Sequence, residues 1–363
     1  MKEMLRFKRI VVKIGSNVLT RPDGTLDVTR ISALVAQIAE LKKNNMDVIL
    51  VSSGAVASGR SELNLNKKLD TVSMRQIYSS VGQAKLINRY YELFREHGLV
   101  CGQVLTTKEN FSSRRHYLNQ KNCISVMLEN DVIPIVNEND TISVTELMFT
   151  DNDELSGLIA SMMNVEALVL LSNVDGIYDG VPGSPDAAII WEIPYDKPGA
   201  VDFIQTTKSQ FGRGGMMTKY NIARKIASEG IAVIIANGKK DNILPNLLKK
   251  NSSETCTTFI PNESLTSNVK KWIAHSNGFA KGEIHINAGA REALMGNKAT
   301  SLLPVGVIKV LGEFEKDDIV KIMDEKKQQI GMGKVRYDSQ QAAALVGKPG
   351  NRPIIHYDYL YVE

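Results

Sequence analysis

Two lysines in unusual positions are the first residues of this chain that could do chemistry. Lys13 lies near the end of an otherwise apolar run at 9–14, where an ammonium group is costly unless it has a partner. Lys219 follows three glycines and falls one turn into a pattern with helical spacing. Ammonium groups beside glycine backbone suit a phosphate, because cations and free backbone amides both stabilise phosphate oxygens. Equally, Lys13 could reach past the sheet edge into solvent, Gly15 could simply make a turn, and the glycines before Lys219 could form a flexible hinge.

Asn and Asp side chains cluster in two segments that follow an apolar run at 132–136. The first is Asn137-Glu138-Asn139-Asp140-Thr141, and the second is Thr150-Asp151-Asn152-Asp153-Glu154. Oxygen acceptors of this kind could bind an α-amino group and a metal–phosphate complex. The alternative is a solvated polar loop in which Asp151 caps a helix over 153–164. Capping would explain some of these residues, but not both clusters.

Two further segments combine small and polar residues directly after apolar runs. Ser52-Ser53-Gly54-Ala55 precedes a helix that we expect to begin at Val56, and the free N–H groups of a helix N-terminus favour anions. Ser172-Asn173-Val174-Asp175 follows an apolar run at 168–171 and is a reasonable place for nucleotide contacts. Either segment could instead be an ordinary turn.

The elements that must position these residues indicate an α/β fold. Continuous apolar runs separated by amphipathic helical patterns are typical of an open, mostly parallel sheet sandwiched by helices. In such a sheet, ligands bind beyond the carboxyl ends of the strands, where the segments described above lie. The expected strands are at 9–14, 47–51, 100–105, 132–136, 167–171 and 231–236.

A second, smaller unit is expected toward the C-terminus. The segments beyond residue 276 are short, glycine-punctuated and strand-like, which is typical of a small β-barrel. We therefore predict a catalytic domain over 1–262, a linker over 263–275 and a β-barrel domain over 276–363. Within the barrel we expect strands at 283–286, 308–311, 319–323, 329–335 and 354–362, and one helix at 338–345.

The composition excludes several classes of protein. With 363 residues, 43% hydrophobic and 23% charged, the chain is typical of a globular protein of two domains. A formal net charge of +4 gives no electrostatic reason to expect nucleic acid as the main ligand. No stretch approaches the roughly 20 apolar residues of a membrane span, so no membrane partner is expected. Three cysteines without a CxxC pair disfavour a disulfide framework or a zinc site and favour a cytoplasmic location.

The order of these motifs resembles the amino-acid kinase superfamily, and within it the members that phosphorylate glutamate. The matching segments are VVKIGSNVL, VSSGAVASG, VGQAKL, IVNENDTI, TDNDELSG and GRGGMMTK. Two later segments, GEIHINAGAREAL and SLLPVGV, resemble a PUA domain. The resemblance implies the amino-acid kinase fold and Mg²⁺-dependent transfer of the γ-phosphoryl group of ATP to the γ-carboxylate of L-glutamate. The product would be L-glutamate 5-phosphate, in the first step of proline biosynthesis.

The resemblance also implies roles for individual residues. Lys13 and Lys219 would stabilise the transferring phosphoryl group, and Asp153 would orient both lysines. No general base is needed, because the attacking carboxylate is already ionised near neutral pH. The residues implied to bind glutamate are Ser53, Gly54, Asn137, Asp140, Asp151 and Asn152. Those implied to bind ATP are Lys13, Gly15, Ser172, Asn173, Arg213, Gly214, Gly215, Met216, Met217, Thr218 and Lys219. The chain departs from the family at Asn173, where Asp is usual, and at Thr150, where Gly is usual.

Three alternatives compete with this interpretation. Another amino-acid kinase would act on acetylglutamate, aspartate, carbamate or UMP. An RNA-binding protein would fit a PUA domain, but residues 276–363 hold 12 Lys or Arg against 11 Asp or Glu, so RNA is not expected as a partner. The intact set of Lys13, Asp153 and Lys219 argues against a sensor without catalytic activity. From the resemblance alone we expect a homo-oligomer and feedback inhibition by proline, while the number of metal ions stays open.

Overall fold

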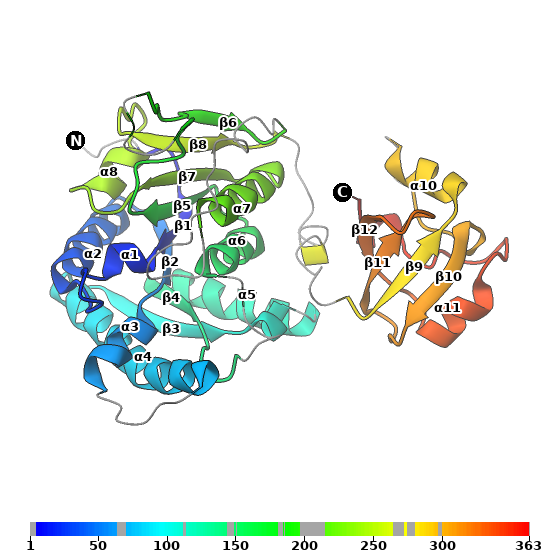
Figure 1. Ribbon diagram of the computed structural model, residues 1–363, viewed down its shortest axis with the longest axis horizontal. Helices are drawn as coiled ribbons and strands as arrows, with labels where there is room; N and C mark the ends of the chain where they lie inside the picture. Colours follow the sequence, from blue (N-terminus) through cyan, green and yellow to red (C-terminus); the bar gives the residue numbers. More distant parts are fainter. Residues whose placement is uncertain are drawn as a thin grey trace. The chain divides into compact units, whose positions relative to one another are not determined.

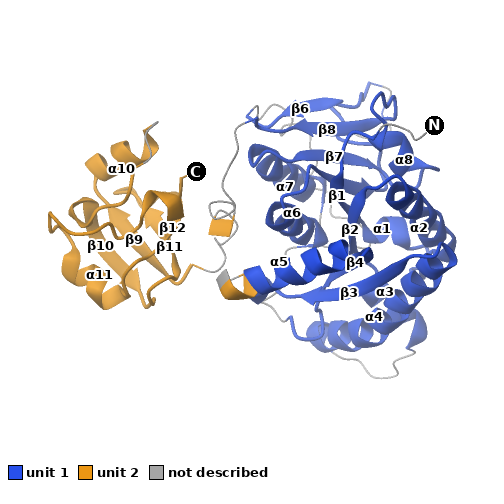
Figure 2. Cartoon of the chain, turned by 180° about the vertical axis from the view of Figure 1, so that it is seen from behind, with its two compact units in different colours: residues 1–110, 118–265 blue, residues 111–117, 266–363 orange. Residues whose placement is uncertain are grey.

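The chain divides into two compact units in the computed structural model (Figure 2). The first comprises residues 1–110 and 118–265, and the second comprises residues 111–117 and 266–363. The predicted domain boundaries stay predictions, because much of the expected linker over 263–275 lies outside the described residues. The structure describes residues 5–63, 70–111, 114–143, 149, 151–180, 184, 186–196, 215–263, 272–273, 280–296 and 300–362.

An eight-stranded sheet in the order β3-β4-β2-β1-β5-β7-β8-β6 forms the centre of the first unit (Figure 1). From β3 to β7 all neighbouring strands are parallel, and β8 then runs antiparallel to β7. The predicted mostly parallel α/β sheet is therefore confirmed. The strands are β1 (Arg9–Ile14), β2 (Asp47–Ser52), β3 (Val100–Thr106), β4 (Val132–Glu138), β5 (Ala167–Ser172), β6 (Glu192–Pro194), β7 (Ala232–Asn237) and β8 (Cys256–Ile260).

Helices cover the two faces of this sheet. Successive residues of a strand point to opposite faces, so Ile10, Val12 and Ile14 join one apolar cluster with residues of α2, α4 and α8. Lys13 belongs to the other face, where α6 packs on β1 and β5 and α7 packs on α6. No helix of the described part of the chain is long and apolar enough to cross a membrane. The helices are α1 (Ser16–Leu19), α2 (Val28–Lys43), α3 (Ala55–Glu62), α4 (Thr71–Glu96), η1 (Lys108–Phe111), α5 (Arg114–Glu129), α6 (Asn152–Met163), α7 (Met216–Ser228) and α8 (Ile243–Leu248).

The direction in which the chain adds strands changes beside β1. The chain first places β2 on one side of β1 and β4 beyond it, and later places β5 on the other side of β1. Ligands of open α/β sheets bind at such a switch point, beyond the carboxyl ends of the strands. Lys13 is the next-to-last residue of β1, and Ser52, Glu138 and Ser172 are the last residues of β2, β4 and β5.

Two strands beyond β7, namely β8 and the edge strand β6, were missed by the sequence interpretation. β8 begins at Cys256, close to the point where the sequence changes character, and its polar threonines weaken the apolar signal of a strand. β6 has only three residues, which is too short for an alternating pattern. The predicted helix start at Val56 is one residue late, because α3 begins at Ala55.

The second unit contains a five-stranded sheet in the order β10-β9-β11-β12-β13, which confirms a small β unit at the C-terminus. β9 and β11 are parallel and the other neighbouring strands are antiparallel. The prediction of one strand over 354–362 is wrong, because Ile355 makes an isolated bridge with Leu302 and a 3₁₀ turn follows. The elements are β9 (Gly282–Ile286), α10 (Ala288–Met295), η5 (Pro304–Gly306), β10 (Val307–Gly312), β11 (Ile319–Met323), β12 (Gln329–Lys334), α11 (Ser339–Leu345), η6 (Tyr357–Tyr359) and β13 (Leu360–Val362).

Candidate functional site

The carboxylate of Asp153 lies between the two lysines that the sequence singled out. Lys13 Nζ is 2.6 Å from Asp153 Oδ1, and Lys219 Nζ is 2.8 Å from Asp153 Oδ2. All three side chains are buried, and Asp153 is only 1% exposed. Two positive charges and one negative charge leave a net positive charge among these three groups, and a buried positive charge favours an anionic ligand. The structure thus brings together the three residues predicted to be catalytic.

Different surroundings shift the pKa values of the two aspartates in opposite directions. Burial by itself would raise the pKa of Asp153, but the ammonium groups of Lys13 and Lys219 outweigh it and lower the pKa to about 2. Burial raises the pKa of Asp151, and the negative charge of Asp153 raises it further. Asp153 is therefore a permanent anion that holds both lysines, whereas Asp151 is an aspartate whose charge lacks full compensation.

Asp151 caps helix α6, as one of the two interpretations of its segment predicted. Its Oδ1 accepts hydrogen bonds from the backbone N–H groups of Asp153 and Glu154, at 2.9 and 3.0 Å. Its Oδ2 is buried and makes no hydrogen bond with the described residues. Mg²⁺ in kinases is held by one or two carboxylates together with nucleotide phosphates. Asp151 Oδ2 is an oxygen that could coordinate such an ion. In the described part of the chain, no cluster of three metal-ligating side chains occurs.

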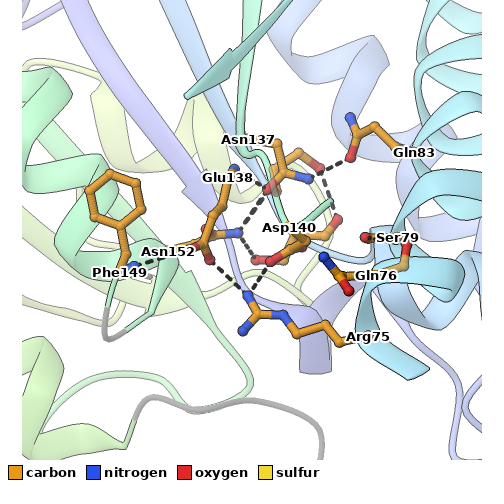
Figure 3. Close-up of polar contacts among 11 residues, drawn as sticks. Arg75, Gln76, Ser79, Gln83, Asn137, Glu138, Asp140, Phe149 and Asn152 are labelled. Atoms are coloured by element: carbon orange, nitrogen blue, oxygen red, sulfur yellow. Dashed lines mark hydrogen bonds and ion pairs between the residues drawn. The ribbon is translucent and has the colours of Figure 1, made fainter. Parts of the chain in front are cut away.

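The side-chain amide of Asn152 connects the start of α6 to the ends of β2 and β4. Its Nδ2 donates to Ser52 O, Ser53 Oγ and Asn137 Oδ1, at 3.1, 3.0 and 3.1 Å. Asn137 in turn donates from its Nδ2 to Gln83 Oε1 of α4, at 2.8 Å (Figure 3). Of the predicted glutamate-binding residues, Ser53 and Asn137 therefore both lie within hydrogen-bond distance of Asn152.

Two glycines allow the backbone to pass close to this network. Gly54, at the N-cap of α3, has φ +103°, a conformation that a side chain disfavours, and a Cβ there would lie 3.2 Å from Leu26 Cδ2. A Cβ on Gly15 would lie 3.1 Å from Leu171 O and 3.8 Å from Lys13 Nζ. Gly15 thus lies beside the ammonium group of Lys13 after β1, whereas Gly54 lies against Leu26 after β2.

Asp140, the predicted partner of an α-amino group, is held by a residue to which the sequence gave no role. Arg75 of α4 donates from Nη2 to Asp140 Oδ1 and to Glu138 Oε2, the latter at 2.9 Å (Figure 3). A signal for this contact exists in the sequence, because Arg75, Ser79 and Gln83 recur every four residues and form a polar stripe along a helix. What that stripe faces cannot be read from its spacing.

The predicted nucleotide residues lie on two further elements. Ser172 ends β5 opposite Asn237 of β7, and Asn173 follows it. Helix α7 begins at Met216 with Gly215 as its N-cap, so Met217, Thr218 and Lys219 complete its first turn, as predicted. The ammonium group of Lys219 points to Asp153 on α6, whereas the hydroxyl of Ser172 lies 3.5 Å from Asn173 Oδ1. Arg213, Gly214 and Thr150 lie outside the described residues.

Comparison with known proteins extends this picture to the whole chain. The family model of the amino acid kinase family matches residues 8–237, and that of the PUA domain matches residues 282–356. A glutamate 5-kinase of Bacteroides thetaiotaomicron is 68% identical over 98% of this chain and 99% of its own length. A glutamate 5-kinase of Chlorobaculum tepidum is 45% identical over 98% of each chain.

A solved structure supports the same fold at much lower identity. Carbamate kinase from Giardia lamblia, bound to AMP-PNP, superposes with a TM-score of 0.52 at 16% identity. The match covers 71% of this chain and 100% of that one. The resemblance stated from the motifs is thereby confirmed, both for the fold and for the family. The chain belongs to the amino acid kinase family and, within it, to the glutamate 5-kinases that carry a C-terminal PUA domain.

Proposed function

We propose that this chain transfers the γ-phosphoryl group of ATP to the γ-carboxylate of L-glutamate and so forms L-glutamate 5-phosphate, in the first step of proline biosynthesis. The names of its relatives support the substrate and the reaction. The single structural observation that supports the chemistry best is the buried arrangement of Lys13, Asp153 and Lys219.

Phosphoryl transfer to a carboxylate brings two anions together, so catalysis rests on alignment and on neutralisation of charge. Lys13 and Lys219 supply two ammonium groups that share one carboxylate, that of Asp153. Each lysine has three donor hydrogens, so it can keep one on Asp153 and offer another to a phosphate oxygen. Asp153 is the positioning residue that holds both lysines. The ionised γ-carboxylate attacks without a base.

The other end of glutamate would lie among the residues after β2 and β4. Ser53, Asn137 and Asn152 supply amide and hydroxyl groups that can exchange their mutual hydrogen bonds for bonds to the substrate's α-carboxylate. Asp140 supplies a negative charge for the α-ammonium. Gly54 lets the backbone approach between the two ends of the substrate.

ATP would bind beyond β5 and α7, near Gly15, Ser172, Asn173 and the first turn of α7. When bound with the nucleotide, Mg²⁺ would neutralise phosphate charge, and Asp151 is the residue that we expect to coordinate the ion. A homo-oligomer, feedback inhibition by proline and a cytoplasmic location remain predictions from the resemblance and the composition.

The test is glutamate-dependent formation of ADP by the purified full-length chain with Mg²⁺ and ATP. Acetylglutamate, aspartate, carbamate and UMP serve as competing substrates, and a parallel series with proline tests feedback inhibition. We expect ADP formation with glutamate and at least tenfold less with each of the others. Equal or greater turnover of another substrate would assign the chain to that activity instead.

A further inference from the structure

The side-chain amide of Asn137 has a fixed orientation at the end of β4. Its Oδ1 accepts from the backbone N–H of Glu138 at 2.9 Å and from Asn152 Nδ2 at 3.1 Å. A backbone N–H can only donate, so the atom that faces it must be the oxygen of the amide and not the nitrogen. Asn137 Nδ2 therefore points to the other side, where it donates to Gln83 Oε1 at 2.8 Å (Figure 3).

The backbone carbonyl of Ser52 fixes the amide of Asn152 in the same way. A carbonyl oxygen can only accept, so the atom that faces Ser52 O must be Asn152 Nδ2. The two hydrogens of Nδ2 are shared among Ser52 O, Ser53 Oγ and Asn137 Oδ1. Asn152 Nδ2 is thus fully used within this network. Ser53 Oγ accepts from Asn152, so the hydroxyl hydrogen of Ser53 can be donated to another group.

Two donors of this network suit a substrate carboxylate. Asn137 Nδ2 has two hydrogens and gives one to Gln83, so it can give the other to a ligand without losing an existing bond. Ser53 can add its hydroxyl hydrogen. In the proposed function, the α-carboxylate of glutamate is the group that would accept both.

Gln83 reaches Asn137 because helix α4 lies close to α3. A Cβ on Gly82 would overlap Ala55 O, and a Cβ on Gly59 would overlap Tyr78 O, so both positions need glycine for α3 and α4 to pack directly. Gly82 and Gln83 are neighbours in the segment VGQAKL, to which the proposed function gives no role. The glycine allows the close contact, and the next residue places an acceptor opposite Asn137.

Loss of the Gln83 acceptor would leave Asn137 Nδ2 without this bond. Asn137 is only 2% exposed, so water cannot readily take the place of Gln83. The amide cannot turn over instead, because Glu138 N–H and Asn152 Nδ2 both require the oxygen where it is. The side chain would have to leave its position to find another acceptor, and the donor for the carboxylate would move with it.

We propose that Gln83 is a positioning residue, which orients Asn137 toward the α-carboxylate of the substrate and so favours an α-amino acid over acids or amines that lack this group. The inference rests on the proposed function. Gln83 acts at Asn137, whereas the phosphoryl group would lie at Lys13 and Lys219. Its loss should therefore change the KM for glutamate and not kcat or the KM for ATP.

The test compares three ligands on full-length wild type and Gln83→Met. Glutamate is the substrate, glutarate lacks the α-amine, and 4-aminobutyrate lacks the α-carboxylate. Inhibition constants of the two analogues are measured against glutamate-dependent ADP formation. We expect Gln83→Met to raise the KM for glutamate and the inhibition constant of glutarate at least tenfold. The inhibition constant of 4-aminobutyrate, kcat and the KM for ATP should stay within threefold of wild type.

Gln76→Met is the matched control, because Gln76 is the same residue type on the same face of α4. Its Nε2 donates to Thr141 O at 2.8 Å, so it contacts the loop after β4 at a different residue. It should leave the constants for glutamate and glutarate within threefold. Gln83 is half-buried, and Met and Leu are both good helix formers, so Gln83→Leu is a second variant that lacks the acceptor and should give the same result.

A double variant shows whether Gln83 acts through Asn137. Asn137→Ala should weaken glutamate and glutarate as well, and adding Gln83→Met to it should change these constants less than threefold further. An added loss as large as that of Gln83→Met alone would mean that Gln83 acts independently of Asn137. Equal weakening of all three ligands, or an unchanged KM for glutamate in Gln83→Met, would also overturn the inference.

The failure of the proposed function has a separate signature. A wild-type enzyme without glutamate-dependent ADP formation would overturn the proposed function itself. A wild-type enzyme that phosphorylates glutamate, with Gln83→Met equal to wild type toward all three ligands, would overturn only the role of Gln83.

Discussion

Asn152 and Asp153 are adjacent at the start of α6, yet their side chains contact different groups. Asn152 donates to Ser53 and Asn137, whereas Asp153 pairs with Lys13 and Lys219. Successive residues of a helix point about 100° apart, so one helix start can reach both ends of a small substrate. Substitutions on the two sides should therefore have kinetically separable effects.

Lys219→Met should reduce kcat by about 10² to 10³ while changing the KM for glutamate less than threefold, because the lost ammonium acts on charge that develops during transfer. Steady-state kinetics with varied glutamate and ATP measure both constants. Lys43→Met, at an exposed position of α2, is the control. An unchanged kcat in Lys219→Met would remove this lysine from the mechanism.

Asp140→Ala should act mainly on substrate binding. Removing the acceptor for the α-ammonium should raise the KM for glutamate by about tenfold or more, since hydrogen bonds to charged groups contribute about 1.5–3 kcal/mol. The KM for ATP should change less than twofold. A calorimetric titration with glutamate gives an independent value, and an unaltered affinity would contradict the assignment of Asp140 to the amine.

Acid should weaken the fold through Asp153. Its pKa is lowered to about 2 in the folded protein from 3.8, so the unfolded chain binds the proton more readily. The resulting stabilisation is fully present above about pH 4 and is lost as the pH falls toward 2. It corresponds to about 2 kcal/mol of the free energy of unfolding.

This effect can be measured by urea unfolding between pH 6 and pH 3 with and without Asp153→Asn. Asp151 has a raised pKa and works in the opposite direction, so both proteins should carry Asp151→Asn. The protein that retains Asp153 should lose more stability toward acid. At pH 7 Asp153→Asn should also destabilise by about 3–5 kcal/mol, because two buried ammonium groups lose their partner. Parallel pH curves for the two proteins would contradict this account.

The sequence predicted most of the strands well, because strands depend on local apolar patterns, and the local setting of Lys13 and Lys219 singled out these two lysines. The link from Asp153 to both lysines was implied by the family resemblance and not by a local pattern. β1 is a continuous apolar run that contains one lysine, and the first turn of α7 follows three glycines. The contacts of Arg75 with Glu138 and Asp140 could not be predicted in this way. A helical spacing of four residues shows that Arg75 and Gln83 share a face, but only the packing of α4 determines what that face contacts.

Gly82→Ala should test that packing directly. The added methyl group meets backbone rather than a flexible side chain, so we expect a loss of about 1–3 kcal/mol in the free energy of unfolding. Gly289→Ala is the control, because a Cβ on Gly289 would meet only Asn287 Oδ1, at 3.6 Å. Gly98→Ala is less suitable, because Gly98 has φ +72°, a conformation that a side chain disfavours. Thermal unfolding of Gly82→Ala and Gly289→Ala measures the difference, and equal melting temperatures would mean that the α3–α4 contact can relax at no cost.

The close approach of α3 and α4 has a consequence for how the site can evolve. The exit of β2 leads into α3, and the loop after β4 contacts α4, so the close contact of α3 and α4 joins two sides of the proposed glutamate site. One of these two sides therefore cannot move outward without the other. Relatives that accept a longer or shorter acid on this scaffold should therefore differ in the side chains that line the pocket, while the spacing between the two helices stays the same.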